Sequence, residues 1–107
     1  MKTVIGLPAY NEEKNIGKVI SELQELDYSV MICNDGSSDQ TGKIAEKMGA
    51  IVINHQKNLG YGAAIKSLFD KASEIDCDVL ITFDADGQHN ISEIKDVLDP
   101  LISKKAD

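Results

Sequence analysis

Long apolar runs are missing from this sequence. Its uninterrupted apolar runs, such as residues 30–33 and 79–81, reach at most four residues, whereas a membrane-spanning helix requires ~20. The N-terminal residues also lack the apolar stretch and the small-residue cleavage site of a signal peptide. We therefore expect no membrane segment in this chain and a cytoplasmic location.

Basic residues are also scarce. The 11 lysine and arginine residues are outnumbered by 18 aspartate and glutamate residues, which gives a formal net charge of −7. Because phosphate backbones select for basic surfaces, this charge argues against nucleic acid as a partner. The same charge would repel a smaller phosphate ligand unless a cation is bound between the ligand and the protein.

Cysteine is rare, and the chain is short. The two cysteines, Cys33 and Cys77, lie in or beside apolar segments, which favours buried thiols in a reducing compartment. A chain of 107 residues that is 42% hydrophobic and 27% charged has the size and composition of one globular domain. We therefore treat residues 1–107 as a single domain.

Strand-like and helix-like segments alternate along the whole chain. Strands are predicted at residues 3–7, 29–33, 50–54 and 79–83, and helices at residues 11–26, 39–48, 62–73 and 91–103. This order indicates an α/β fold with a mostly parallel sheet, helices on both faces and right-handed crossovers. Ligands of such sheets bind beyond the carboxyl ends of the strands. A polar motif follows each predicted strand at that end.

The most informative motif, residues 84–89, follows the fourth predicted strand. Asp84 and Asp86 are two positions apart, so in an extended chain both carboxylates point the same way. At ~5 Å the two charges repel by about 3 kcal/mol at an effective dielectric of ~20. A divalent cation removes this repulsion, and Mg²⁺ commonly binds one or two carboxylates together with substrate phosphates. Gln88 offers a further oxygen; the alternative is a turn that caps the last helix.

The segment after the first predicted strand, residues 8–12, has two interpretations. Asn11 can cap the following helix, and Glu12 and Glu13 suit the positive end of a helix. Capping does not explain an aromatic residue close to a proline at the end of a strand. Tyr10 can pack against a nucleobase, and Glu12 can accept hydrogen bonds from the base or from ribose.

Acidic and glycine-rich segments follow the second and third predicted strands. Asp39 is interpreted as the cap of the second helix. We expect the carboxylate of Asp35, at the end of the strand, to face the crevice, where it can accept the ring N–H of uracil or the paired N–H groups of guanine. Residues 57–64 are either a plain loop or a loop whose backbone N–H groups bind an anion.

Taken together, the four motifs resemble family 2 glycosyltransferases of the A-type (Rossmann-like) fold. Residues 8–12, 34–41, 58–64 and 84–89 agree with the family in order and cover nearly the whole chain. The similarity is greatest to the branch that includes dolichyl-phosphate mannosyltransferase and related polyprenyl-phosphate sugar transferases. The resemblance implies an inverting enzyme with Mg²⁺ or Mn²⁺ as cofactor. It implies transfer of sugar from a UDP- or GDP-sugar to an acceptor such as polyprenyl phosphate, at the cytoplasmic face of the membrane.

The resemblance also assigns roles to individual residues. The implied nucleotide-sugar-binding residues are Pro8, Ala9, Tyr10, Glu12, Asp35, Lys57, Gly62, Asp84 and Ala85, and the implied metal ligands are Asp86 and Gln88. Asn34 departs from the family, since many members have an aspartate there, and this leaves Asp35 as the base-reading carboxylate of its segment. No residue is assigned as the catalytic base.

A second departure is that the chain stops soon after the fourth predicted helix, where family members continue with another strand and an acceptor-binding region. We therefore expect a truncated half of the enzyme that binds the donor and does not transfer sugar to an acceptor. We also expect self-association into a homo-oligomer, through an unpaired edge strand and an apolar patch.

Two other classes of protein share parts of this pattern. A nucleotidyltransferase that makes the nucleotide sugar has similar architecture and metal carboxylates, but residues 8–12 lack the glycine-rich basic loop that it needs. A receiver-like signalling domain, which is a non-catalytic binding module, requires a phosphorylatable aspartate after the third strand, and residues 54–56 contain none. The sequence favours the glycosyltransferase over both.

Overall fold

The computed structural model describes residues 2–82, in which strands and helices alternate. The strands are β1 (Thr3–Ala9), β2 (Ser29–Asp35), β3 (Ile51–His55) and β4 (Val79–Thr82), and the helices are α1 (Ile16–Glu25), α2 (Thr41–Lys47) and α3 (Tyr61–Glu74). The predicted order of these elements is confirmed, and the helix predicted at residues 91–103 lies outside the described residues. None of the helices described is long and apolar enough to cross a membrane.

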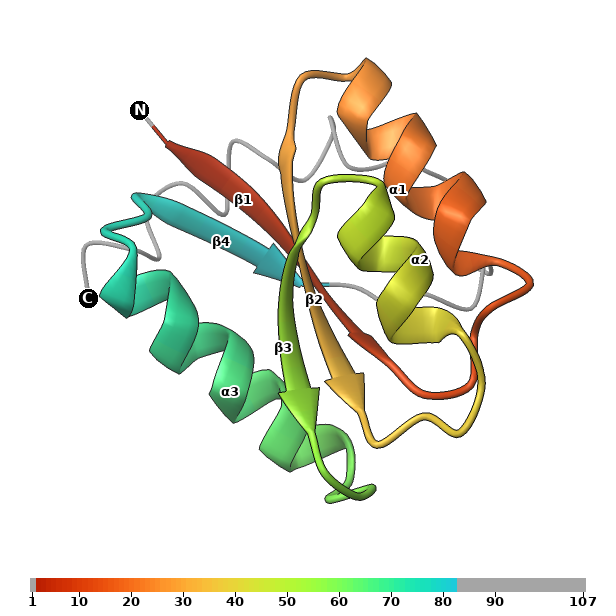
Figure 1. Ribbon diagram of the computed structural model, residues 1–107. Coiled ribbons are helices and arrows are strands. Elements are labelled where there is room, and N and C mark those ends of the chain that lie inside the picture. Colours follow the sequence, from red (N-terminus) through yellow and green to blue (C-terminus); the bar gives the residue numbers. More distant parts are fainter. Residues whose placement is uncertain (1, 83–107) are drawn as a thin grey trace.

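The strands of the described sheet are parallel and have the order β3-β2-β1-β4. The chain moves outward from β1 through β2 to β3 and then returns to the other side of β1 (Figure 1). Between β2 and β3, the register pairs Asn34 with Asn54 and Asp35 with His55. Because all strands run the same way, their carboxyl ends share one edge of the sheet, which is where the sequence predicts the ligand.

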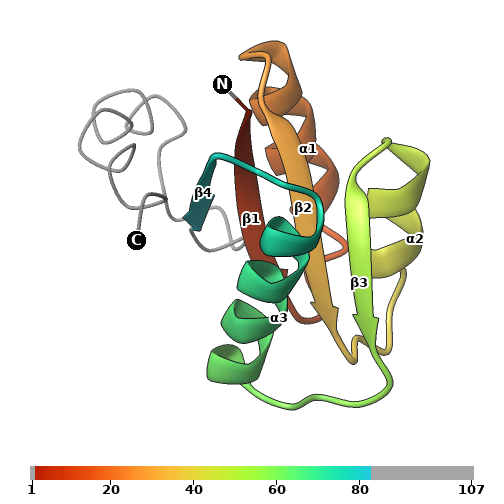
Figure 2. The ribbon, with the colours of Figure 1, turned by 90° about the vertical axis from the view of Figure 1, so that its left-hand side faces the viewer.

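The reversal in strand order separates the helices onto two faces of the sheet. α1 and α2 cover one face and α3 covers the other (Figures 1 and 2). Right-handed crossovers produce this arrangement, because the crossover from β3 to β4 runs in the opposite direction to the first two. The prediction of a parallel sheet with helices on both faces is confirmed.

Each face of the sheet has its own apolar core. The core under α1 and α2 comprises Ile5, Leu7, Ala9, Ile16, Val19, Ile20, Leu23, Val30, Ile32, Ala45, Val79 and Ile81. The core under α3 comprises Val4, Met31, Cys33, Ala64, Leu68, Ala72 and Cys77. Side chains of β1 and β2 alternate between the two cores, as the pleat of a strand requires. Cys33 and Cys77 are buried thiols, as predicted.

The first helix begins later than predicted. α1 begins at Ile16, and the prediction of a helix from residue 11 was wrong. Asn11 has a positive φ of 54° and does not cap α1. The backbone N–H groups of residues 11–13 donate instead to side chains of residues 37–41. These bonds to the neighbouring loop outweigh the helical preference of the segment, so the first helical turn forms only beyond it.

Candidate functional site

The residues at the end of β1 lie at the carboxyl edge of the sheet. Pro8 and Ala9 are its last two residues, and Ala9 is buried in the core under α1 and α2. Tyr10 follows with 48% of its surface exposed, so its ring is accessible to a ligand. Glu12 lies further along the loop, where one of its carboxylate oxygens accepts a hydrogen bond of 3.2 Å from the side chain of Asn15.

Hydrogen bonds join the loop after β1 to the loop after β2 in both directions. The first loop donates from Asn11 N to Ser37 Oγ (2.9 Å), from Glu12 N to Thr41 Oγ1 (2.9 Å) and from Glu13 N to Asp39 Oδ2 (3.2 Å). The second loop donates from Ser38 N to Asn11 Oδ1 (2.8 Å) and from Gln40 N to Glu13 Oε1 (3.0 Å). Asp39 also accepts the N–H of Thr41, the first residue of α2 (3.0 Å). The residue at the N-cap of α2 is Gln40, so the prediction that Asp39 is the cap was wrong by one position, although Asp39 does bind the start of the helix.

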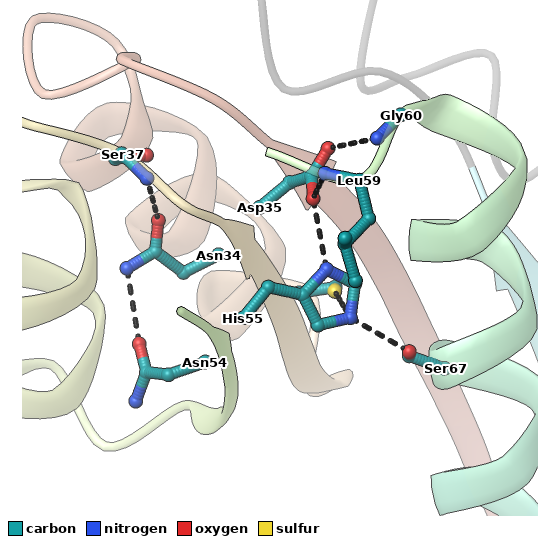
Figure 3. Close-up of polar contacts among 9 residues, drawn as sticks. Asn34, Asp35, Ser37, Asn54, His55, Leu59, Gly60 and Ser67 are labelled. Carbon is teal, nitrogen blue, oxygen red and sulfur yellow. Dashed lines mark hydrogen bonds and ion pairs between the residues drawn. The ribbon is translucent and has the colours of Figure 1, made fainter. Parts of the chain in front are cut away.

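Asp35 is the last residue of β2 and is almost completely buried, with 5% of its surface exposed. Its Oδ1 accepts hydrogen bonds from the Leu59 N–H (2.8 Å) and from His55 Nδ1 (2.8 Å), and its Oδ2 accepts the Gly60 N–H (3.0 Å) (Figure 3). The carboxylate was expected to be open to the crevice. It is instead enclosed by β3 and by the loop that leads into α3.

These hydrogen bonds determine the charge state of Asp35. Burial on its own would raise the pKa of this carboxyl group. The hydrogen bonds from the Leu59 N–H, from His55 and from the Gly60 N–H outweigh burial, so the pKa of Asp35 is lowered below its ordinary value. Asp35 is therefore a carboxylate at neutral pH, and it can only accept hydrogen bonds.

His55 connects Asp35 to α3. Since a carboxylate only accepts, Nδ1 of His55 carries a proton and donates a hydrogen bond to Asp35 Oδ1. Ser67 Oγ lies 2.8 Å from Nε2, and Cys33 Sγ lies 3.6 Å from it. Burial, with a smaller effect from the charge of Asp35, raises the pKa of the Cys33 thiol to about 11. This thiol therefore stays protonated and unreactive at neutral pH.

The order Asp35, His55, Ser67 resembles that of a catalytic triad, but the surroundings do not suit nucleophilic catalysis. Ser67 lies in the middle of α3. Backbone N–H groups there donate to carbonyl groups one turn earlier, so they cannot form an oxyanion hole. The chain of hydrogen bonds therefore positions the Asp35 carboxylate and does not make Ser67 a nucleophile.

Asn34, the residue that departs from the family pattern, belongs to a separate contact. Successive side chains of β2 point to opposite faces, so Asn34 lies on the face of α2 while Asp35 lies on the face of α3. Its amide donates to Asn54 Oδ1 (3.0 Å) and accepts the Ser37 N–H (3.3 Å) (Figure 3). A Cβ at Gly42 would lie 2.5 Å from the Asn34 amide nitrogen. The amide is therefore packed against α2, away from Asp35.

The glycine-rich loop before α3 lies directly on Gly36. A Cβ at Gly36 would lie 2.3 Å from the carbonyl carbon of Lys57 and 2.3 Å from the Asn58 nitrogen. The N–H groups of Leu59 and Gly60 donate to Asp35 and so are not available to an anion. The loop therefore encloses Asp35 and uses two of the backbone donors that were considered for an anion.

The four remaining predicted site residues, Asp84, Ala85, Asp86 and Gln88, lie outside the described residues. Within residues 2–82 no group of three His, Cys, Asp or Glu side chains could hold a metal ion. The last described strand, β4, pairs with β1 and ends at Thr82. The strand order reverses between β1 and β4, where α1, which follows β1, and α3, which precedes β4, lie on opposite faces of the sheet. Ligands of open α/β sheets bind in the crevice at such a point. The predicted metal motif thus follows the strand beside this crevice.

Two depressed carboxyl pKa values predict how the fold responds to acid. Burial raises the pKa of Asp39, but hydrogen bonds from Thr41 and from the Glu13 N–H outweigh it, so this pKa is lowered like that of Asp35. The unfolded chain then binds more protons than the native state below ~pH 4. Stability is full above the unfolded pKa and is lost as the pH falls through the lower folded values.

We expect the melting temperature to fall as the pH decreases from 5 to 2.5, with a smaller slope for Asp39→Asn. Circular dichroism at a series of pH values measures this. Asp70→Asn, on the exposed surface of α3, is the control for the change in charge. A slope for Asp39→Asn equal to that of the wild type would show that Asp39 does not contribute.

Comparison with known proteins supports the assignment made from the motifs. The family model for glycosyl transferase family 2 matches residues 4–107. The chain is 37% identical to the UDP-N-acetylglucosamine–dolichyl-phosphate N-acetylglucosaminyltransferase of Methanococcus voltae, over 91% of this chain and 46% of that protein. It is 28% identical to the polyprenol monophosphomannose synthase of Mycolicibacterium smegmatis, over 94% of this chain and 41% of that protein. The chain therefore spans less than half the length of either relative.

Solved structures share the fold. The mannosyl-3-phosphoglycerate synthase from Rubrobacter xylanophilus matches with a TM-score of 0.77 at 22% identity, over 95% of this chain and 36% of that one. The glucosyl-3-phosphoglycerate synthase from Mycobacterium tuberculosis, in complex with Mn²⁺, uridine diphosphate and glucosyl-3-phosphoglycerate, matches with a TM-score of 0.64 at 25% identity, over 78% and 33%. These matches confirm the predicted A-type fold. The match to the family model favours the glycosyltransferase over the nucleotidyltransferase and receiver-like alternatives. Similarity to the two relatives named above agrees with the branch that the motifs suggested. The chain belongs to glycosyl transferase family 2.

Proposed function

We propose that this chain binds the nucleoside diphosphate sugar donor of an inverting glycosyltransferase whose acceptor is a polyprenyl phosphate. The observation that carries the proposal is the common position of the motifs. Those after β1, β2 and β3 lie at one edge of a parallel sheet, and the acidic motif follows β4 directly. The names of the relatives support a lipid-linked acceptor. Such an acceptor would place the whole enzyme at the cytoplasmic face of a membrane.

The nucleoside is assigned to the described part of the site. Tyr10 is half-exposed, so its ring can stack on the base. Asp35 supplies a fixed carboxylate for the N–H groups of the base. Lys57, exposed on the loop that encloses Asp35, offers a positive charge near the base, and Glu12 can accept from ribose. Pro8 and Ala9, at the end of β1, would contact the nucleoside at the same edge of the sheet.

The diphosphate is assigned to the segment after β4 and to a divalent cation, Mg²⁺ or Mn²⁺. Asp86 and Gln88 would hold the cation with oxygen ligands, which both metals accept, and Asp84 and Ala85 would contact the ribose. When bound, the cation neutralises the charge on the diphosphate that leaves in the transfer reaction. An overall charge of −7 fits this requirement, since the protein supplies few cations of its own for a diphosphate. Gly62, in the first turn of α3, adds a backbone N–H at the helix N-terminus.

Calorimetry tests the proposed function. UDP and GDP are titrated into the 107-residue chain, first with Mn²⁺ and then with EDTA. We expect binding of at least one of the two nucleotides with Mn²⁺ and a loss of most of its affinity with EDTA, because the metal bridges the diphosphate to an acidic protein. Equal affinity in both conditions would contradict the metal site, and no binding of either nucleotide would contradict the proposed function.

A further inference from the structure

The hydrogen bonds around Asp35 leave little capacity for a ligand. An ionised carboxylate has about four acceptor positions, two on each oxygen. Oδ1 already accepts two hydrogen bonds, from the Leu59 N–H and from His55 Nδ1, each at 2.8 Å. Oδ2 accepts one, from the Gly60 N–H at 3.0 Å. One acceptor position is therefore left, on Oδ2.

We propose that His55, held in place by Ser67, is a specificity-determining residue for the nucleobase, because it fills the acceptor position that a two-donor base would need. This inference rests on the proposed function, in which Asp35 receives the base. Guanine presents a ring N–H and an exocyclic amino group side by side, and this pair binds best to both oxygens of a carboxylate. Uracil presents a single ring N–H, which matches the one position left. Cytosine presents an acceptor at that ring position, and an acceptor is repelled by a carboxylate.

The surroundings of His55 keep its ring in the orientation that this role requires. The side chains of His55 and Asp35 are 9% and 7% exposed, so neither can easily turn toward solvent. Ser67, on α3, lies 2.8 Å from Nε2, the ring nitrogen away from Asp35 (Figure 3). With both ring nitrogens engaged, the imidazole is fixed between β2 and α3. Ser67 is thus a positioning residue that acts through His55.

The selectivity of nucleotide binding separates this role from a purely structural one. Loss of a structural contact would weaken all nucleotides alike. His55→Phe keeps a ring of similar size but removes the donor to Oδ1, so two acceptor positions become available, one on each oxygen. Affinity for GDP is then expected to rise relative to affinity for UDP, so the ratio of the two affinities changes. His55→Asn keeps a donor at the position of Nδ1 and is the matched control.

The experiment is calorimetry of UDP, GDP and CDP with Mn²⁺ on the wild-type chain, His55→Phe, His55→Asn and Ser67→Ala, with circular dichroism to verify folding. The wild type is expected to prefer UDP at least about tenfold over GDP and over CDP. This preference should fall to within about threefold in His55→Phe, remain in His55→Asn and weaken partly in Ser67→Ala.

A wild type that binds UDP and GDP equally, or an unchanged ratio in His55→Phe, overturns this inference and leaves the proposed function intact. If His55→Phe does not fold, loss of the preference in His55→Asn overturns it. Absence of binding by any nucleotide overturns both.

Discussion

Replacing Asp86 with alanine is expected to weaken Mn²⁺-dependent binding of a nucleoside diphosphate by at least about 100-fold. Loss of a residue that merely orients a metal ligand typically reduces affinity by about 10–100-fold, so loss of a ligand should lie at or above that limit. The fold should tolerate the change, because removal of Asp86 relieves its repulsion with Asp84. Calorimetry of UDP with and without Mn²⁺ measures the binding, and thermal melting measures the fold.

The control for Asp86→Ala is a variant that changes the charge equally but far from the site. Asp70, on the exposed surface of α3, makes an ion pair of 2.9 Å with Lys66, and surface pairs of this kind contribute little. Asp70→Ala should keep the Mn²⁺ dependence of the wild type. A sharp drop in the melting temperature of Asp86→Ala would show instead that Asp86 supports the structure. Unchanged nucleotide affinity would show that the metal lies elsewhere.

The architecture could be predicted from the sequence because apolar spacing and strand order are local and topological properties. Each of the strands and helices within residues 2–82 overlaps a predicted segment, although α1 begins later than predicted. Alternation of the two kinds of element implied parallel pairing and helices on both faces, since few other arrangements connect such elements without left-handed crossovers. The carboxyl edge of the sheet followed from these facts alone. The edge of the sheet at which the motifs lie could therefore be predicted before its contacts were known.

The start of α1 could not be predicted in this way. Asn11, Glu12 and Glu13 have the composition of a helix start, and the sequence does not show that their N–H groups donate to the loop after β2. Such contacts join residues more than 25 positions apart, and they depend on how two loops meet at the sheet edge. Tertiary hydrogen bonds overrode the local preference here.

The environment of Asp35 was also beyond prediction from composition. Its place at the end of β2 was expected, but its burial by the loop before α3 was not. His55 was not singled out, although a parallel register that pairs the last residues of two neighbouring strands would have placed it beside Asp35. The sequence did not indicate a role for Ser67, because serine is common on the half-buried side of an amphipathic helix. Its role depends on the distance between α3 and β3.

The second large effect is expected at Gly36, where the loop that encloses Asp35 touches β2. Gly36 has a φ of +75°, and a Cβ there would lie 2.3 Å from the backbone of both Lys57 and Asn58. In Gly36→Ala the positive φ costs about 1–2 kcal/mol. The clash with backbone atoms must also displace the loop, which weakens the hydrogen bonds from the Leu59 and Gly60 N–H groups to the Asp35 carboxylate. This loss costs a further ~1–3 kcal/mol in total, which is the penalty for leaving a buried polar group unsatisfied.

We expect the free energy of unfolding of Gly36→Ala to fall by about 2–5 kcal/mol, which corresponds to a decrease in melting temperature of roughly 8 °C or more for a domain of this size. Gly49→Ala is the matched control, because Gly49 has a φ of +87° but a Cβ there would meet nothing within 4 Å. This variant should lose only the backbone contribution, about 1–2 kcal/mol. Urea unfolding followed by circular dichroism measures both. Nucleotide affinity should fall in Gly36→Ala alone, since the displaced loop no longer holds Asp35. Equal destabilisation of the two variants would mean that the loop yields without loss and that its contact with Gly36 does not shape the site.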